Sequence, residues 1–298
     1  MRILMSGASG FIGSAFRRAL QQADHEVSAL TRSAPPDSSA VWWDPAAGEL
    51  DPDSVDGFDA VVHLAGEGIG DRRWNEAHKR RVRDSRIQGT SLLSRTLAEL
   101  EQPPQVLLSA SAMGYYGDRG DEPLTESAPA GDGFLAGVVQ AWEKSTAPAS
   151  DAGIRVVTTR SSLVLDGGGG VLKRQLIPFR LGVGGRLGAG RQWWSWITLE
   201  DEVRAMQHLL EADVSGAVNL SSPSPVTNAE FTDILGRVLS RPTFFSVPRV
   251  ALEVVLGKEM ATEMLFFSQR LVPSKLEGSG FSFRHPELEA ALRGVLGK

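Results

Sequence analysis

The feature that most constrains the fold is a glycine-rich turn near the start of the sequence, in the stretch SGASGFIG. Gly7, Gly10 and Gly13 recur at every third position, after an apolar run and before an amphipathic pattern. Such spacing permits a tight turn, close approach of a pyrophosphate and close packing of a helix on a strand, and the helix offers unpaired N–H groups to phosphates. The pattern predicts a dinucleotide-binding loop, with a packing turn alone as the alternative. The residues assigned to it are Gly7, Ser9, Gly10, Phe11, Ile12 and Gly13.

Strand-like and helix-like patterns alternate through the first half of the chain. Apolar strands that alternate with helices favour a parallel sheet covered on both faces. We therefore expect an α/β protein with a Rossmann-type, doubly wound parallel sheet. The expected strands of this sheet are at 2–7, 25–32, 40–45, 59–66, 104–111, 154–165 and 216–222. The helices expected to cover it are at 11–22, 72–100, 131–145 and 199–212.

The composition of the sequence changes after Asp166. A run of glycines and a Gly- and Trp-rich stretch at 181–196 cannot form one long regular element. Prolines divide the remaining tail, in which helices are expected at 228–240, 248–256, 258–267 and 286–296. We expect a dinucleotide-binding domain and a smaller, mostly helical lobe on the substrate side. The domain takes 1–165 and about 198–222, and the lobe takes 166–197 and 223–298.

Composition excludes several classes of function. The 298 residues carry a net charge of −5, which makes nucleic acid an unexpected partner. The chain has no cysteine, which rules out disulfides, thiolate metal sites and cysteine nucleophiles, and its five scattered histidines predict no metal site. No apolar run approaches the ~20 residues of a membrane span. We expect a cytoplasmic protein with a small-molecule substrate and no membrane partner, whose long helices could pair two subunits into a homodimer.

The end of the second expected strand bears on the choice of coenzyme. A cofactor with a free ribose 2′-hydroxyl favours Asp or Glu there, but the sequence offers Thr31, Arg32 and Ser33. A guanidinium flanked by hydroxyls suits a 2′-phosphate, so we expect NADP(H) rather than NAD(H). Alternatively, Arg32 is a solvated residue at the strand end. Asp44 either contacts the adenine amine or caps a turn before Pro45.

Separated motifs then make the chain resemble an extended short-chain dehydrogenase/reductase. They are GASGFIG at the glycine loop, HLAG at 63–66, SRIQGT at 85–90 and SAS at 109–111. The stretches at 115–126 and 268–283 resemble an atypical branch that carries the name "epimerase family protein", and sometimes a SulA-like one, with a small C-terminal domain of unknown function. The resemblance implies an NAD(P)-dependent oxidoreductase or epimerase acting on a small polar substrate, with nucleotide sugars among the candidates.

The resemblance also implies particular positions at the cofactor. The segment after the fourth strand would pass beneath the nicotinamide and its ribose, and His63 is interpreted as a packing or hydrogen-bonding residue. Arg86 stands where the family usually has Asn. Arg160, at the end of another strand, contacts the cofactor or substrate, or else pairs with an acid. The resemblance or a place near the end of a strand assigns seven residues to the cofactor, namely Leu64, Ala65, Gly66, Glu67, Arg86, Ser109 and Arg160.

The residues that usually transfer the proton in this family are missing. Tyr and Lys, one helical turn apart, are matched by Phe134 and Val138. Tyr115 and Tyr116 are the only tyrosines, and both follow Ser111, the counterpart of the family's serine. The catalytic candidates are therefore Ser111, Tyr115 and Tyr116. The alternative is that the tyrosines anchor a loop.

Further side chains are candidates for the substrate side. Lys79, Arg83 and Arg86 share one helical stripe that could hold an anion, or else form a solvated face. Glu143 is expected to pair with a nearby basic residue or to cap local structure. The alternative is that Glu143 acts as a general base. The stretch 192–196 supplies Gln192, Trp193, Ser195 and Trp196, and its aromatic side chains either stack on a ligand ring or anchor the lobe. Because the Tyr/Lys pair is absent, a non-catalytic NADP(H)-binding sensor is the alternative to an enzyme.

Overall fold

The computed structural model describes residues 1–33 and 40–298, which form two compact units. The first unit contains 1–111, 138–159 and 203–218, and the second contains 112–137, 160–202 and 219–298. This division differs from the boundaries expected from the sequence, which gave 112–137 to the dinucleotide-binding domain. The reason lies in strand pairing, because β7 (Pro123–Leu124) pairs in parallel with β16 (Arg270–Leu271) in the tail of the chain.

An eight-stranded sheet, with the order β13-β8-β6-β5-β1-β2-β3-β4, confirms the predicted Rossmann-type fold. β1 pairs in parallel with β2 and with β5, β2 pairs in parallel with β3, and β5 pairs in parallel with β6, whereas β3 and β4 are antiparallel. The order reverses between β1 and β5, and ligands of doubly wound sheets bind at that point. The strands are β1 (Arg2–Ser6), β2 (Glu26–Thr31), β3 (Ala40–Asp44), β4 (Glu49–Leu50), β5 (Ala60–His63), β6 (Val106–Ala112), β8 (Arg155–Ser161) and β13 (Gly216–Leu220).

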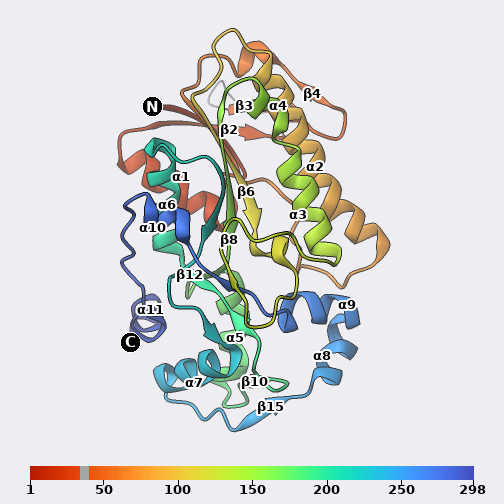
Figure 1. Ribbon diagram of the computed structural model, residues 1–298, viewed down its shortest axis with the longest axis vertical. Coiled ribbons are helices and arrows are strands. Elements are labelled where there is room, and N and C mark those ends of the chain that lie inside the picture. The colour runs from red at the N-terminus through yellow and green to blue at the C-terminus, as the bar shows by residue number, and fades with distance from the viewer. Residues whose placement is uncertain (34–39) are drawn as a thin grey trace. The chain divides into compact units, whose positions relative to one another are not determined.

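Helices cover both faces of the sheet in the first unit. α2 (Glu76–Ala98) and α4 (Ala147–Asp151) lie along one face, and α1 (Phe11–Gln22) lies along the other (Figure 1). α2 begins four residues later than expected, because the Asn75 side chain accepts the His78 N–H and caps the helix there. Buried leucines of α2 pack on the apolar strands, as the alternating pattern predicts. This cluster includes Leu4, Val61, Leu92, Leu93, Leu97 and Leu107.

The second unit has a core of its own, built on aromatic residues. Trp194, Trp196 and Phe231 are buried with leucines from three helices. A capping box of Thr227 and Glu230 starts one of these helices. The helices of this unit are α5 (Gly170–Arg180), α7 (Asn228–Leu239), α8 (Arg249–Leu256), α9 (Lys258–Ala261), α10 (Ser274–Gly278) and α11 (Leu288–Leu296). Its short strands beyond β7 and β16 are β9 (Leu163–Leu165), β10 (Gly185–Leu187), β11 (Trp193–Trp194), β12 (Trp196–Thr198), β14 (Val226–Thr227) and β15 (Phe245–Val247).

Several expected elements are shorter or divided. The strand expected at 154–165 is interrupted at Ser162, and β9 leaves the main sheet to pair with β12. The helix expected at 131–145 is α3 (Phe134–Lys144), which follows Gly133 at φ +111°. The helix expected at 258–267 ends as α9 and continues as a π-helical turn over Thr262–Phe266. α6 (Leu199–Glu211) matches its prediction. In the described part of the chain, no helix has the length and apolar character needed to cross a membrane.

Candidate active site

The glycine loop has the geometry of a tight turn against the start of a helix. Gly7 has φ +68°, which favours glycine, and the Gly10 N–H donates to the Gly7 carbonyl at 3.0 Å. A Cβ on Gly13 would lie 2.1 Å from the Gly7 carbonyl oxygen, so a larger residue cannot fit without moving the backbone. No side chain among the described residues caps Gly10 at the start of α1. The first amides of α1 are therefore available to an anion.

The loop after β5 lies directly against Gly7. A Cβ on Gly7 would come within 2.7 Å of the Leu64 carbonyl carbon. Ser6 Oγ accepts the N–H groups of Leu64 and Ala65, at 3.1 and 3.3 Å, and lies 2.7 Å from His63 Nδ1. The two loops at the reversal point of the sheet are thus fixed to each other. Ser6 was not singled out by its sequence, because its role depends on a strand that lies 57 residues away.

His63 is a buried hydrogen-bonding residue. Complete burial lowers the pKa of its imidazole to about 4, so the ring is neutral at pH 7. Its Nε2 has no hydrogen-bond partner among the described residues, and the ring packs edge-on against Trp43 at 5.8 Å between centroids. These contacts are those of the packing and hydrogen-bonding residue that the sequence analysis expected.

The end of β2 exposes the residues expected to bind a 2′-phosphate. Arg32 and Ser33 are exposed, and Thr31 Oγ1 accepts the Ser33 N–H at 3.2 Å. Asp44 Oδ1 accepts the N–H groups of Ala46 and Ala47, at 2.9 and 3.2 Å, which is the turn-capping alternative stated for it. Its contact with adenine stays a prediction, as do the roles of 31–33.

Arg86 is buried against the loop after β5. Its side chain is 8% exposed, and Nη1 donates to the carbonyls of Glu67 and Val82, each at 3.0 Å. The guanidinium lies over the Trp142 ring, with 5.0 Å from Cζ to the centroid. Burial lowers the pKa of Arg86 to about 10, partly offset by the charge of Glu67, so the group remains a cation at pH 7.

The rest of the expected basic stripe turns toward acids on the surface of α2. Lys79 Nζ lies 3.8 Å from a Glu76 carboxylate oxygen, and Arg83 Nε lies 2.9 Å from that of Asp84. Glu67, assigned to the cofactor, lies 3.6 Å from Arg81 through its carboxylate. Its backbone N–H donates to Ser85 Oγ. Of the three residues in the stripe, Arg86 is the one that the structure buries.

Ser111, near the end of β6, has an acidic partner. Its hydroxyl donates to Glu143 Oε1 at 2.5 Å, and Ser111 is 5% exposed. Glu143 is carried by α3 and is found one residue beyond Trp142, which donates to Thr90 Oγ1. Ser109, which the sequence assigned to the cofactor, is fully buried and donates weakly to the Ala110 carbonyl at 3.5 Å. The sequence placed Ser111 and Glu143 among the candidates without predicting that they meet.

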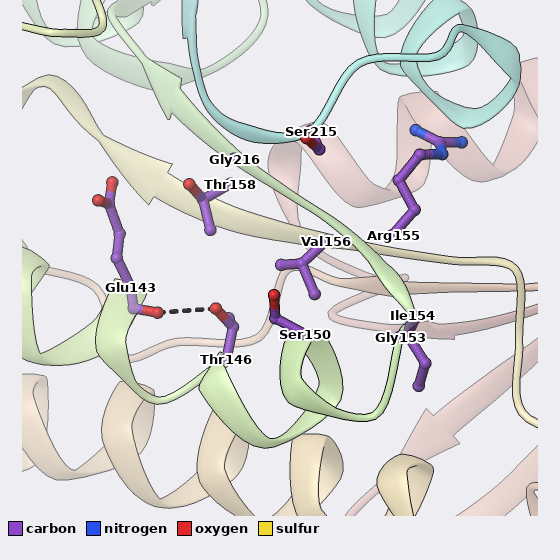
Figure 2. A pocket seen from close by; sticks show the side chains of 10 residues that line it. All are labelled: Glu143, Thr146, Ser150, Gly153, Ile154, Arg155, Val156, Thr158, Ser215 and Gly216. Carbon is purple, nitrogen blue, oxygen red and sulfur yellow. Dashed lines mark hydrogen bonds between the residues drawn. The ribbon is translucent and has the colours of Figure 1, made fainter.

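Glu143 also lines a cavity of about 500 Å³ in the first unit (Figure 2). Its backbone carbonyl accepts the Thr146 hydroxyl at 2.7 Å, and its carboxylate points away from α4 in Figure 2. Thr158 and Ser150 add hydroxyls to the lining. The guanidinium of Arg155 donates instead to backbone carbonyls at the end of α6 and the turn after it, namely those of Leu209, Leu210 and Val214.

In the second unit, both tyrosines surround Arg160. The Tyr116 hydroxyl accepts from Arg160 Nη1 at 2.9 Å and donates to Asn219 Oδ1 at 2.7 Å. The Tyr115 ring centroid lies 3.4 Å from Arg160 Cζ. Burial raises the pKa of Tyr116, although Arg160 opposes this effect. These are the contacts of a loop anchor, whereas the catalytic roles of Tyr115 and Tyr116 stay predictions. Asn219 was missed, because its polar partners come from other segments.

The residues at 192–196 bind protein groups in the second unit. Gln192 Nε2 donates to the Leu265 carbonyl at 3.1 Å, and Ser195 Oγ donates to the Gln269 carbonyl at 2.8 Å. The indole of Trp196 donates to the Ser224 carbonyl, and that of Trp193 to Asp121. These contacts follow the anchoring alternative, and stacking on a ligand ring stays a prediction. In the described part of the chain, no group of His, Asp and Glu could hold a metal ion.

Comparison with known proteins identifies the family. The family described as NAD dependent epimerase/dehydratase matches residues 3–221. The chain belongs to this family. A domain of unknown function, DUF1731, matches residues 247–295.

Similar proteins span the whole chain. Epimerase family protein Mb2239 of Mycobacterium bovis is 46% identical over 291 residues, which cover 97% of this chain and 96% of the relative. The crystal structure of human epimerase family protein SDR39U1 (isoform 2) contains NADPH and has a TM-score of 0.91 at 35% identity, with all of both chains covered. A nucleoside-diphosphate sugar epimerase from Corynebacterium glutamicum has a TM-score of 0.81 at 36% identity, and the match covers all of this chain and 58% of that one.

Within this epimerase-family chain, the DUF1731 segment supplies a residue that the sequence did not point to. Both carboxylate oxygens of Glu263 accept backbone N–H groups at the start of α3, from Phe134 and Leu135, each at 2.8 Å. A Cβ on Gly133 would lie 3.0 Å from the same carboxylate. Glu263 therefore caps the helix at the position of the missing tyrosine.

Proposed function

We propose that this member of the epimerase/dehydratase family is an NADP(H)-dependent oxidoreductase or epimerase that acts on a small polar substrate. The observation that carries the proposal is the glycine loop, where Gly13 leaves no room for a Cβ and the amides that start α1 are uncapped. Pyrophosphates bind such loops through backbone N–H groups. The NADPH in the structure of the 35% identical human protein supports the same coenzyme here.

The charge at the end of β2 favours the phosphorylated coenzyme. Arg32 is exposed there, between Thr31 and Ser33, and a guanidinium with neighbouring hydroxyls matches a 2′-phosphate. Leu64 and Ala65, which donate to Ser6 and lie against Gly7, then line the nicotinamide half of the site together with Gly66. The proposed site lies at the reversal of strand order, where ligands of this fold bind.

Ser111 and Glu143 are proposed to move the proton. When bound, NADP(H) would accept a hydride from the substrate carbon or donate one to it. As an alcohol is oxidised, its hydroxyl proton passes to Ser111 Oγ while the Ser111 proton passes to Glu143, 2.5 Å away. The reverse transfer returns the proton to the carbonyl oxygen. This pair does the work that Phe134 and Val138 cannot do. The hydroxyl of Tyr116 is hydrogen-bonded to Arg160 and Asn219, and a catalytic role of Tyr115 stays a prediction.

Calorimetry with NADPH and NADH tests the coenzyme assignment. We expect NADPH to bind more tightly, and Arg32→Ala to weaken NADPH binding more than NADH binding. Loss of NADPH absorbance is then followed with nucleotide sugars and aldehydes as substrates. Failure of the purified protein to bind either coenzyme refutes the proposal.

The missing Tyr/Lys pair favours a second candidate, a non-catalytic NADP(H)-binding sensor. A sensor needs the glycine loop but not a proton acceptor beside Ser111. NADPH binding without turnover of any carbonyl compound supports the sensor. Turnover that is lost in Glu143→Gln supports the enzyme.

A further inference from the structure

The guanidinium of Arg86 is built into the first unit more firmly than a solvated helix residue requires. Nη1 makes both of its hydrogen bonds, to the Glu67 and Val82 carbonyls. Trp142 covers one face of the guanidinium plane at 5.0 Å. A Cβ on Gly66 would lie only 3.3 Å from Arg86 Cζ, so the absence of a side chain there makes room for the cation. Backbone, ring and glycine together fix the orientation of this charge.

Fixing Nη1 leaves the other two nitrogens of Arg86 available. Nε and Nη2 have no hydrogen-bond partner among residues 1–33 and 40–298, yet neither is one of the fully enclosed polar atoms that lack partners there. These two nitrogens share one edge of the guanidinium. Such an edge donates two parallel hydrogen bonds to the two oxygens of a carboxylate or phosphate. The residue is 8% exposed, so a ligand on this edge would bind a largely desolvated charge.

The position of this edge indicates which molecule would supply the anion. Arg86 lies against the loop that follows β5, at the carboxyl end of a central parallel strand, where ligands of doubly wound sheets bind. In the proposed function, the pyrophosphate is already held by the amides at the start of α1. The substrate, as the second ligand, would then supply the anion that binds Arg86.

We propose that Arg86 is a substrate-binding residue that holds a carboxylate or phosphate group through Nε and Nη2. This inference rests on the proposed function for the presence of the coenzyme. It assigns the substrate to a chemical class, namely polar carbonyl compounds or alcohols that carry such an anionic group near the reacting carbon. It also gives the site a fixed cation, which the absent lysine cannot provide. Being a cation at pH 7, Arg86 binds and orients but does not transfer the proton.

The test uses the full chain saturated with NADP⁺ and calorimetry with three probes: D-glucuronate, D-glucose 6-phosphate and D-glucose. We expect at least one anionic probe to bind and D-glucose not to bind; comparison of the two anions identifies the preferred group. In Arg86→Gln, the affinity for that anion should fall at least tenfold while NADP⁺ binding stays within twofold. Arg86→Lys keeps the charge but loses the paired donors, so its affinity for the anion should lie between those of the wild type and Arg86→Gln. Arg95→Gln, an exposed change on the same helix, should bind like the wild type.

Three results would overturn the inference. They are equal anion binding by the wild type and Arg86→Gln, no anion binding by the wild type at millimolar concentration, and loss of NADP⁺ affinity in step with anion affinity. The last would assign Arg86 to the coenzyme. NADP⁺ binding to the wild type is measured first and the probes are also titrated without it, so failure of the coenzyme to bind, which refutes the proposed function, is seen separately.

Discussion

Replacing Gly13 by alanine tests the glycine loop most directly. The added Cβ would lie 2.1 Å from the Gly7 carbonyl oxygen and 2.9 Å from its carbon, both backbone atoms that cannot rotate away. Overpacking of this kind costs roughly 1–3 kcal/mol, and replacing a helical glycine by alanine returns about 1 kcal/mol. Because the clash is with backbone, we expect a value near the top of that range and a net loss of about 2 kcal/mol in the free energy of unfolding.

The assay combines urea unfolding with NADPH titration. Moving Gly7 also moves the turn that would hold the pyrophosphate, so NADPH affinity should fall at least tenfold. The matched control is Gly137→Ala in α3, where an added Cβ meets nothing within 4 Å and the backbone is helical; this variant should be as stable as the wild type or more so. If Gly13→Ala unfolds and binds NADPH as Gly137→Ala does, the packing argument for the loop is wrong.

Three further changes test the chemistry and the buried network. Glu143→Gln removes the proton acceptor of Ser111, 2.5 Å away, and should lower kcat more than tenfold with NADPH affinity within twofold; unchanged kcat would exclude the pair. Tyr116→Phe leaves Arg160 and Asn219 without the shared hydroxyl and should cost about 1–3 kcal/mol in urea unfolding; stability equal to that of the wild type would contradict the anchor. Burial raises the pKa of Glu202 from 4.5 to about 8, so Glu202 loses its proton at a lower pH in the unfolded state than in the folded state. The free energy of unfolding should therefore fall as pH rises from about 4.5 to 8. Glu202→Gln should flatten that part of the stability curve, and an equally steep curve would show that another group causes it.

The sequence predicted the first unit better than the second for a physical reason. The strands of a parallel sheet are short apolar runs, and the helices between them show their period locally. In the second unit, β7 and β16 pair across most of the tail, and no local pattern indicates that pairing. α5 was missed, because it begins among glycines and contains Pro178. Elements with a local periodicity were therefore predicted, whereas pairings between distant segments were not.

The candidate site shows the same division. The three glycines of the loop act through local backbone geometry, so their spacing was informative. Ser111 and Glu143 were noted separately, but their contact depends on how α3 packs on β6. The unpaired edge of Arg86 depends on which nitrogen meets two carbonyls, and a residue type alone does not specify that.

Because the carboxylate of Glu263 caps α3, the start of this helix depends on a segment that is synthesised later. The carboxylate completes the first turn of α3 from 129 residues further along the sequence. During synthesis from the N-terminus, Phe134 leaves the ribosome long before Glu263 exists. Until the segment with Glu263 has been synthesised, the N–H groups of Phe134 and Leu135 can donate only to water. We therefore expect this helix end to form its final hydrogen bonds only after translation has reached Glu263.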